Sequence, residues 1–492
     1  MVALLYLAGL TPASGCEWSL ITVQLLSIPE PLNVGAARRA RPVNPDELQM
    51  DRQTFRDLEI FEAEGGAPSI FDLLNYTRTS GGSKVLQARL RTPWSKADRI
   101  RAVHEALRFI GEHGAAFDWF PGEVLISPVE QYLNSGLPMV SSNNVLELFF
   151  ESAEVRFGET IEYRRIVGRI LQTARLIHAL RRFAERPELA NPPGDLGPIV
   201  IELRSLLALP AFNNLPDDGS TEPWFWQTMR IDRVLRSDER PALDRILRLT
   251  FEIDALAALS EANRKLGFIV PDVLDGSLEI TADDVRHPFL PYAVGNPLQL
   301  DNTRRLLFLT GPNMAGKTTY LRSCGISIYL AHLGVGVPAR SFRFSPCQSL
   351  FTAIALVDNI REGISFFRAE ALRIKAIARA LADGRRVIAL LDEPFMGTNV
   401  KDAYDASRAV LTRLVKRENS VFVVSSHLLE LGEGLLETRY VECSRFEATE
   451  DGGRLAYDYR LRPGISSQRL GLRVLREEGV FELLDQINPS SS

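Results

Sequence analysis

The fold of this chain is decided by one stretch of its sequence, LLFLTGPNMAGKTT at residues 306–319. This stretch contains the P-loop pattern of Gly, four residues, Gly, Lys and Thr at residues 311–318. The apolar run before the pattern predicts a buried strand, and residues 319–332 after it have a helical pattern. A phosphate cradle at a helix N-terminus requires this order of strand, loop and helix.

We interpret the loop as a nucleotide-binding site whose backbone N–H groups hold phosphates. Lys317 is expected to reach the β- and γ-phosphates of ATP, and the Thr318 hydroxyl to bind Mg²⁺. The residues expected to contact ATP are Gly311, Pro312, Asn313, Met314, Ala315, Gly316, Lys317, Thr318 and Thr319.

Two adjacent carboxylates follow a second apolar run, which lies at residues 387–391. Asp392 and Glu393 are expected at the C-terminal end of that strand, where the ligands of open α/β sheets collect. We expect Asp392 to hold the magnesium ion, directly or through water, and Glu393 to polarise the attacking water as general base. An acidic pair after a buried strand is common by itself, so this assignment depends on the P-loop upstream.

A third apolar run, at residues 421–425, leads to His427. A histidine at the end of a strand suits a sensor of the γ-phosphate, although a lone histidine in such a place is usually structural. The assignment of His427 as a catalytic residue therefore depends on the two motifs before it.

The pattern of apolar and polar residues changes near residue 270. Beyond this point short aliphatic runs alternate with helical segments, which predicts a P-loop, ABC-like ATPase domain at residues 270–475 with a mostly parallel central sheet. Runs at residues 446–449 and 455–461 flank an Asp-Gly-Gly turn and predict an antiparallel hairpin. Residues 476–492 are interpreted as a C-terminal tail.

Before residue 270 the pattern is mostly helical, so residues 51–269 are predicted to form an all-helical core or lever domain. The predicted fold class is therefore α plus α/β. Two long helices are expected, at residues 160–186 and 241–266, the second ended by Gly267. The first carries seven arginines that could follow a DNA backbone. A solvated face whose arginine stems cover apolar surface is the favoured alternative.

Composition sets few other limits on function. The net charge of −5 predicts no general attraction to nucleic acid, so any DNA contact needs a local basic surface. We expect no membrane partner, because no apolar run is long enough to cross a bilayer. The four scattered cysteines fit a reducing cytoplasm. Residues 1–50 are interpreted as a poorly ordered or atypical extension, with a weak export signal as the alternative.

Taken together, the motifs resemble the ATPase of the MutS mismatch-repair family. The string GPNMAGKTTYLR at residues 311–322 is similar to that family's Walker A segment, which is more specific than a generic P-loop. Further elements resemble the family in order: Arg286-His287-Pro288, GISFFRAE at residues 363–370, Asp392-Glu393 with Gly397-Thr398-Asn399, Ser425-Ser426-His427, and the tail at residues 455–471. Upstream, residues 58–61 and 69–92 look like the start of the family's helical core.

The resemblance implies a DNA-binding ATPase of mismatch repair or recombination that works as a dimer. It implies that Asn313 contacts phosphate and that Ser365 approaches the γ-phosphate of the opposite subunit's ATP. The long helices would then carry the ATP-driven change to DNA. We expect a homodimer, with a heteromeric partner as the alternative. The alternative function is an ABC-like module that moves a protein partner without touching DNA.

Several features depart from the family's pattern. Residues 1–50 are too few for the domains that read mismatches in full-length members, which puts direct mismatch recognition in doubt. Phe149-Phe150-Glu151 matches the family's phenylalanine-x-glutamate wedge, but it stands in a helical stretch and is interpreted as a coincidence. Ala353 and Ala355 replace an expected arginine and glycine, and residues 187–226 are interpreted as a reduced or replaced DNA-clamping insertion.

Overall fold

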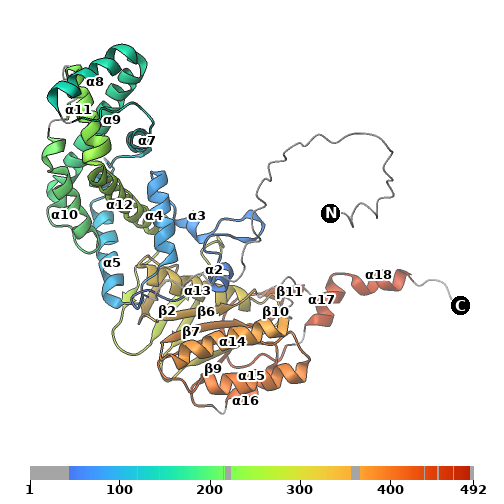
Figure 1. The fold of residues 1–492 in the computed structure, drawn as a ribbon. Helices are drawn as coiled ribbons and strands as arrows, with labels where there is room; N and C mark the ends of the chain where they lie inside the picture. The colour runs from blue at the N-terminus through green and yellow to red at the C-terminus, as the bar shows by residue number, and fades with distance from the viewer. Residues whose placement is uncertain are drawn as a thin grey trace, which may run out of the picture. The chain divides into compact units, whose positions relative to one another are not determined.

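The computed structural model describes residues 44–487, apart from 119, 143, 214, 217–222, 356–365, 437, 452–453 and 469. One compact unit begins at Pro45 and contains both a helical region and a sheet region (Figure 1). The predictions made for residues 1–43 and for Ser365 lie outside the described residues. The mixture of helices with a mostly parallel sheet confirms the coarse fold class that the sequence predicts.

The helical region extends from α2 to α12, with short turns between the helices. Its α-helices are α2 (Arg52–Asp57), α3 (Ile70–Leu74), α4 (Ser80–Arg91), α5 (Ala97–Glu112), α6 (Gly114–Phe117), α7 (Glu123–Leu133), α8 (Val145–Gly158), α9 (Thr160–Ala184), α10 (Leu196–Leu207), α11 (Phe225–Arg233) and α12 (Arg240–Leu266). Three short 3-10 turns lie at Glu64–Gly66, Pro187–Leu189 and Pro210–Phe212, and a π-helical turn lies at Val234–Asp238.

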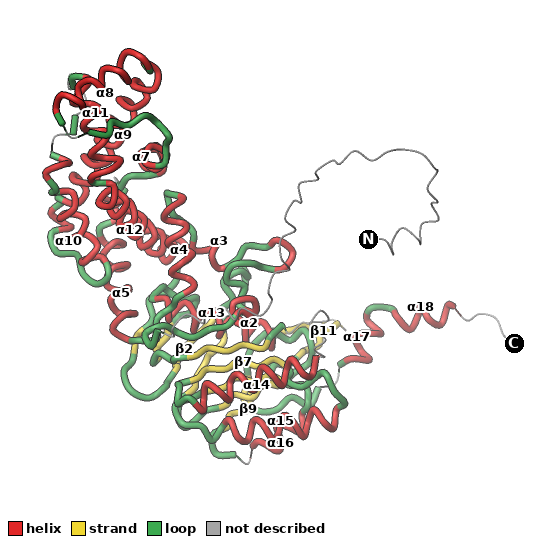
Figure 2. The backbone as a smooth tube through the Cα atoms, in the orientation of Figure 1, coloured by secondary structure: helices red, strands yellow, loops and turns green. Residues whose placement is uncertain are grey.

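Helix α12 is the central element of the helical region. It has 27 residues and packs against α4, α5 and α10 (Figure 2). Gly267 ends it in the left-handed conformation, with φ of 64°, as the sequence predicts. The buried carboxylate of Asp254 accepts hydrogen bonds from the N–H groups of Arg78 and Thr79, both at 3.0 Å, and from the Thr79 hydroxyl at 2.7 Å. These bonds join α12 to the N-terminus of α4.

Helix α9 is the first of the two predicted long helices and packs against α7, α8 and α10. The segment interpreted as a reduced insertion, residues 187–226, includes two 3-10 turns, at Pro187–Leu189 and Pro210–Phe212. It also includes helix α10, which packs on α9 and α12. The Phe149-Phe150-Glu151 string lies on α8, inside the helical region.

The central sheet of the second region has the strand order β12-β9-β4-β8-β7-β6. Its strands are β4 (Leu306–Thr310), β6 (Ser349–Ala353), β7 (Val387–Asp392), β8 (Val421–Ser425), β9 (Val441–Arg445) and β12 (Arg462–Pro463). All neighbours pair in parallel except β12, which pairs with β9 in the antiparallel direction. Strands β4, β8 and β7 are the three predicted from their apolar runs, and they are neighbours. Their C-terminal ends therefore meet at one edge of the sheet.

Both faces of the central sheet are buried. Leu307 and Leu309 of β4 belong to the core that contains helix α13 (Lys317–Leu333). Leu306 and Phe308 belong to a second core with α14 (Phe366–Ala382), α15 (Val400–Leu414) and α16 (Leu429–Leu436). Because alternate residues face opposite cores, the strand needs a continuous apolar run and not an alternating one.

Smaller elements complete the sheet region. A second sheet has the order β1-β5-β2-β3 and consists of β1 (Asp272–Val273), β2 (Ile280–Val285), β3 (Asn296–Leu300) and β5 (Ser341–Phe344). Helices α17 (Gly471–Glu477) and α18 (Val480–Ile487) end the described part. None of the described helices is long and apolar enough to cross a membrane.

The predicted hairpin is present, but its first strand is shifted and its second strand ends at Tyr457 and not at the predicted residue 461. The sequence predicts the first strand at residues 446–449, whereas the hairpin pairs β10 (Ala448–Asp451) with β11 (Arg454–Tyr457). The reason is that the Phe446 ring is buried and its N–H donates to the Thr310 carbonyl at 2.9 Å. Phe446 therefore belongs to the nucleotide-site side of the sheet and not to the hairpin.

Candidate nucleotide-binding site

The loop between β4 and α13 has the backbone that a phosphate cradle requires. Gly311 has φ of 142° and Gly316 has φ of 106°, so both lie in a region that side chains rarely adopt. A Cβ on Gly311 would lie 2.6 Å from the Phe446 carbonyl oxygen. Helix α13 begins at Lys317, two residues earlier than predicted, and its first N–H groups point into the loop.

Lys317 lies across the mouth of this loop. Its buried Nζ donates to the carbonyl oxygens of Gly311 at 2.8 Å and Pro312 at 3.2 Å. The same atom lies 3.8 Å from Glu393 Oε1. Burial lowers the pKa of Lys317, and the nearby Glu393 and Asp392 carboxylates oppose this shift. The loop carbonyls carry only partial negative charge, whereas a bound phosphate would offer the Lys317 ammonium a full negative charge.

Asp392 stands at the end of β7, opposite the first turn of α13. It accepts a hydrogen bond from the Thr318 hydroxyl at 2.6 Å and a second from the Ser425 hydroxyl. Burial raises the pKa of Asp392, and these two hydrogen bonds oppose the rise. The Thr318 hydroxyl and the Asp392 carboxylate are hard oxygen donors that suit Mg²⁺.

No group of three or more His, Cys, Asp and Glu side chains among the described residues could hold a metal ion by itself. Thr318 and Asp392 alone leave most of an octahedral shell unfilled, so an ion there requires phosphate oxygens and water. The residues therefore fit a magnesium ion that arrives with a nucleotide.

Glu393 and His427 form an ion pair beside the loop. His427 Nδ1 lies 3.4 Å from Glu393 Oε2. The hydrogen bond between these two side chains lowers the pKa of Glu393 and raises the pKa of His427. Glu393 has φ of 48°, a conformation that costs energy for a residue other than glycine. The N–H of Glu393 donates to the Ser425 carbonyl at 3.0 Å, which holds this strained turn against β8.

A cavity of about 670 Å³ extends from the loop toward the second sheet. Besides the loop it is lined by His287, Leu290, Tyr292, Asn296 and Tyr459. Apolar and aromatic groups with a few polar ones are the usual lining of a site for a flat heterocycle. Burial lowers the pKa of His287 to about 4, so this imidazole is neutral at physiological pH.

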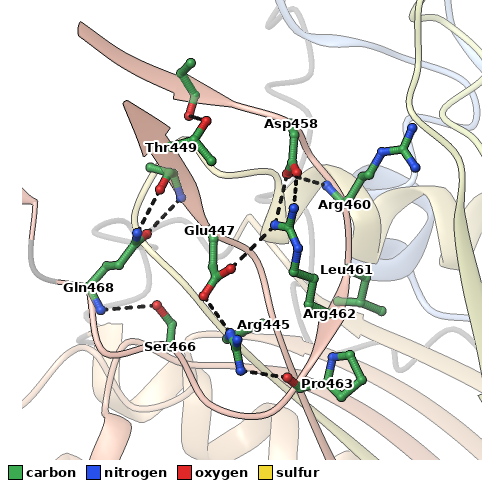
Figure 3. Close-up of polar contacts among 12 residues, drawn as sticks. Arg445, Glu447, Thr449, Asp458, Arg460, Leu461, Arg462, Pro463, Ser466 and Gln468 are labelled. Carbon is green, nitrogen blue, oxygen red and sulfur yellow. Dashed lines mark hydrogen bonds and ion pairs between the residues drawn. The ribbon is translucent and has the colours of Figure 1, made fainter. Parts of the chain in front are cut away.

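Phe446 and Tyr459 line this cavity, and polar contacts join the residues around them in the chain (Figure 3). Arg445 bonds Glu447 at 2.7 Å and the Pro463 carbonyl at 2.7 Å, and Arg462 pairs with Asp458. Nearby, the side chain of Asn296 donates to the Tyr459 carbonyl at 2.9 Å and accepts from the Leu461 N–H at 2.7 Å.

The Tyr459 ring is thereby held against the phosphate loop. Its Cδ1 lies 3.3 Å from the position that a Cβ on Gly316 would occupy. In the sequence Tyr459 stands out only as part of the family-like tail. No sequence signal marks Asn296, because Asn296 and Tyr459 are far apart along the chain.

A second cavity, of about 300 Å³, shares Thr318 and Glu393 with the first. It is lined by Thr318, Ala353, Ile354, Ala355, Glu370, Asp392, Glu393 and Met396. The Glu370 carboxylate accepts hydrogen bonds from the N–H groups of Met396 at 3.1 Å and Gly397 at 3.3 Å. The start of α14 is thus tied to the loop after β7.

The structure brings Lys317, Thr318, Asp392, Glu393 and His427 together around one loop. The remaining predicted contacts, Pro312, Asn313, Met314, Ala315 and Thr319, lie in the loop or in the first turn of α13. Asn313, Met314 and Thr319 also line the larger cavity. Ser365 lies outside the described residues.

Comparisons with known proteins place this chain beside one family. Residues 307–485 match the family model described as MutS domain V. A stretch of 265 residues, 51% of this chain, is 32% identical to the DNA mismatch repair protein MutS of Oleidesulfovibrio alaskensis. The match covers 29% of that protein, so this chain spans well under half the length of the curated relative.

Proposed function

We propose that this chain, which belongs to the MutS family, is a Mg²⁺-dependent ATPase that acts on DNA. The observation that carries the proposal is the convergence of Lys317, Thr318, Asp392, Glu393 and His427 on one phosphate loop. The larger cavity adds support, because its lining could take the base of a nucleotide beside that loop.

Each of these residues would have a separate role in ATP hydrolysis. Lys317 would exchange its bonds to the loop carbonyls for the β- and γ-phosphates. Thr318 and Asp392 would hold Mg²⁺, which neutralises charge that develops on the phosphate oxygens. Glu393 stays ionised at neutral pH because of its bond to His427, so it would accept a hydrogen bond from the attacking water and orient it. His427, paired with Glu393, would then sense the γ-phosphate.

The ATPase proposal is tested with Lys317→Ala. Removing this ammonium group leaves the phosphates without their main cation from the loop, so we expect kcat/KM for ATP to fall by at least about a hundredfold at saturating Mg²⁺. The matched control is Lys416→Ala, which removes an exposed lysine just after α15. Equal turnover by the Lys317 variant and the wild type would refute the proposed site.

We further propose that two chains complete each other's sites through Ser365, on the family resemblance that the sequence shows. The test mixes two inactive variants, Lys317→Ala and Ser365→Ala. A mixed dimer would contain one site with an intact loop and an intact partner serine, so random mixing should restore about a quarter of wild-type activity. Absence of any recovery in a mixture shown to contain mixed dimers would indicate that the serine acts within its own chain or not at all.

We propose that DNA contacts the exposed arginines of α9. Arg169 and Arg181 are used inside the helical region, where they bond the carbonyls of Pro128 at 3.3 Å and Leu207 at 2.7 Å. For these two arginines the structure therefore favours a packing role over DNA contact. In contrast, exposed positions on the same helix are Arg164, Arg165, Arg175 and Arg182.

Exposed arginines on one helix can neutralise successive phosphates. Replacing Arg164, Arg165 and Arg182 by Gln should weaken DNA binding at low salt and reduce the slope of log K against log salt by up to about 3. The same variants should keep their basal ATPase activity. If the wild-type dimer hydrolyses ATP but binds no DNA at low salt, the DNA part of the proposal fails while the ATPase part stands.

The three described cysteines, Cys324, Cys347 and Cys443, are buried thiols. Reduced, buried thiols suit a reducing compartment, and we propose a cytoplasmic location on this ground.

A further inference from the structure

The segment at residues 49–59 spans the predicted boundary at residue 51 between the extension and the helical region, and it is built into the ATPase sheet. Gln49 pairs in parallel with Ser349 at the start of β6, the edge strand of the central sheet. The Gln49 N–H donates to the Gln348 carbonyl at 2.9 Å, and the Leu350 N–H donates to the Gln49 carbonyl at 3.0 Å. Helix α2 follows at once and packs along β6.

The key side chain of α2 is Asp57, which is almost fully buried. Its carboxylate accepts hydrogen bonds from the Thr352 hydroxyl at 2.7 Å, the Ile354 N–H at 2.9 Å and the Ala355 N–H at 3.1 Å. The amide of Gln53 donates a fourth bond at 2.8 Å. A carboxylate with four neutral donors is held in one orientation and in turn fixes the backbone that donates to it.

The backbone that Asp57 fixes is a wall of the smaller cavity. Ile354 and Ala355 line that cavity opposite Thr318 and Asp392, the proposed magnesium ligands. The attacking water and any group that reaches the γ-phosphate from this side must fit there. A displacement of about 1 Å at such a wall is enough to change hydrolysis without changing the phosphate loop.

Helix α2 also holds the helix on the other side of the same cavity. The Arg373 guanidinium of α14 donates to the Thr352 carbonyl at 2.7 Å and to the Thr54 hydroxyl at 2.8 Å, and it forms an ion pair with Asp51. Glu370, less than one turn earlier on α14, lines the cavity. The end of β6 and the start of α14 are therefore both fixed to α2.

The helix of the phosphate loop is held in the same way. Glu59, just after α2, forms an ion pair with Arg322 of α13 at 3.1 Å. The chain then continues into α4, whose N-terminus is bonded to Asp254 of α12. A movement of α4 and α12 can thus reach β6, α13 and α14 through residues 49–59.

We propose that Asp57 is a positioning residue for ATP hydrolysis and that α2 couples the helical region to the ATP site. The inference rests on the ATPase activity proposed above. Asp57 touches neither the phosphate loop nor the carboxylates that would bind magnesium; it sets the place of Ile354 and Ala355 beside them. Loss of this contact should slow turnover and leave nucleotide binding intact.

The test uses a graded series in the full chain. Asp57→Ala removes every acceptor, Asp57→Asn keeps one acceptor oxygen, and Thr352→Val removes one donor without changing side-chain shape. We expect kcat to fall between about tenfold and a hundredfold for Asp57→Ala and by less for the other two. KM for ATP and the affinity for a fluorescent ATP analogue should stay within about twofold of wild type.

Asp98→Ala is the matched control, because this aspartate on α5 has a side chain that is 97% exposed. Thermal unfolding is recorded for each variant, and Thr352→Val remains readable if Asp57→Ala fails to fold. Unchanged kcat in folded Asp57→Ala or Thr352→Val would overturn the inference, as would a parallel loss of kcat, nucleotide affinity and thermal stability. Failure of the wild type itself to hydrolyse ATP would instead refute the proposed function.

Discussion

The contact between α12 and α4 gives a prediction whose size follows from the structure. Asp254 is 1% exposed, and its three hydrogen bonds come from Arg78 and Thr79 at the start of α4. Asp254→Ala would leave two N–H groups and one hydroxyl without this acceptor. A hydrogen bond to a charged group contributes about 1.5 kcal/mol, so three contribute about 4.5 kcal/mol.

Part of this sum is offset by the cost of burying the carboxylate. Burial raises the pKa of Asp254, which shows that the ionised form is less favourable there than in water, although the hydrogen bonds oppose the rise. We therefore expect Asp254→Ala to lower the free energy of unfolding by about 3 kcal/mol. The measurement is urea unfolding followed by tryptophan fluorescence.

The matched control is Asp244→Ala on the same helix. Asp244 is 41% exposed and pairs with Arg240 one turn away at 3.2 Å, an arrangement that contributes at most about 0.5 kcal/mol. A loss below about 1 kcal/mol for Asp254→Ala would refute the reasoning that these buried bonds carry the junction. Because the chain runs from α2 through α3 into α4, the same variant should also reduce any effect of DNA on ATP turnover.

Two further predictions concern the nucleotide site. The ion pair raises the pKa of His427 above 6.5 and lowers the pKa of Glu393 below 4.5, so its stabilising effect should be complete between pH 4.5 and 6.5. The effect should be lost as pH rises through the folded-state pKa of His427. It should also be lost as pH falls through the folded-state pKa of Glu393. Urea unfolding from about pH 5 to pH 9 should show the alkaline loss in wild type, and a His427→Asn variant that keeps it would contradict the assignment. Gly311→Ala should weaken ATP binding at least about tenfold, because its Cβ would lie 2.6 Å from the backbone oxygen of Phe446. Gly471→Ala, where a Cβ meets nothing within 4 Å, is its control, and equal affinities in an ATP-analogue titration would exclude this clash.

The sequence alone determined the elements whose signals are local. The apolar runs of β4, β7 and β8 coincide with the predicted strands, because a strand buried on both faces needs a continuous apolar run. The apolar spacing of residues 160–186 predicts α9, and Pro241 near a first turn together with Gly267 predicts α12, which Gly267 ends as predicted. The P-loop spacing at residues 311–318 predicts a phosphate site from the sequence alone.

The tertiary structure alone decided which distant segments share a site. The Asp57 carboxylate and its donors Thr352, Ile354 and Ala355 are about 300 residues apart in sequence, with separations of 295 to 298. No local pattern marks such a contact, because an aspartate at the end of a short helix is equally suited to solvent. The helical periodicity of residues 51–57 likewise gave no sign that α2 packs on the sheet.

The same limit explains the shifted hairpin and the cavity wall. The Asp-Gly-Gly turn predicts Phe446 in the first strand of the hairpin, but burial against the phosphate loop determines its place. Local sequence fixes dihedral preferences and apolar faces, whereas the partner of each face depends on how the whole chain packs. That packing brings Asn296 to Tyr459 and Asp57 to the backbone beside the proposed ATP site.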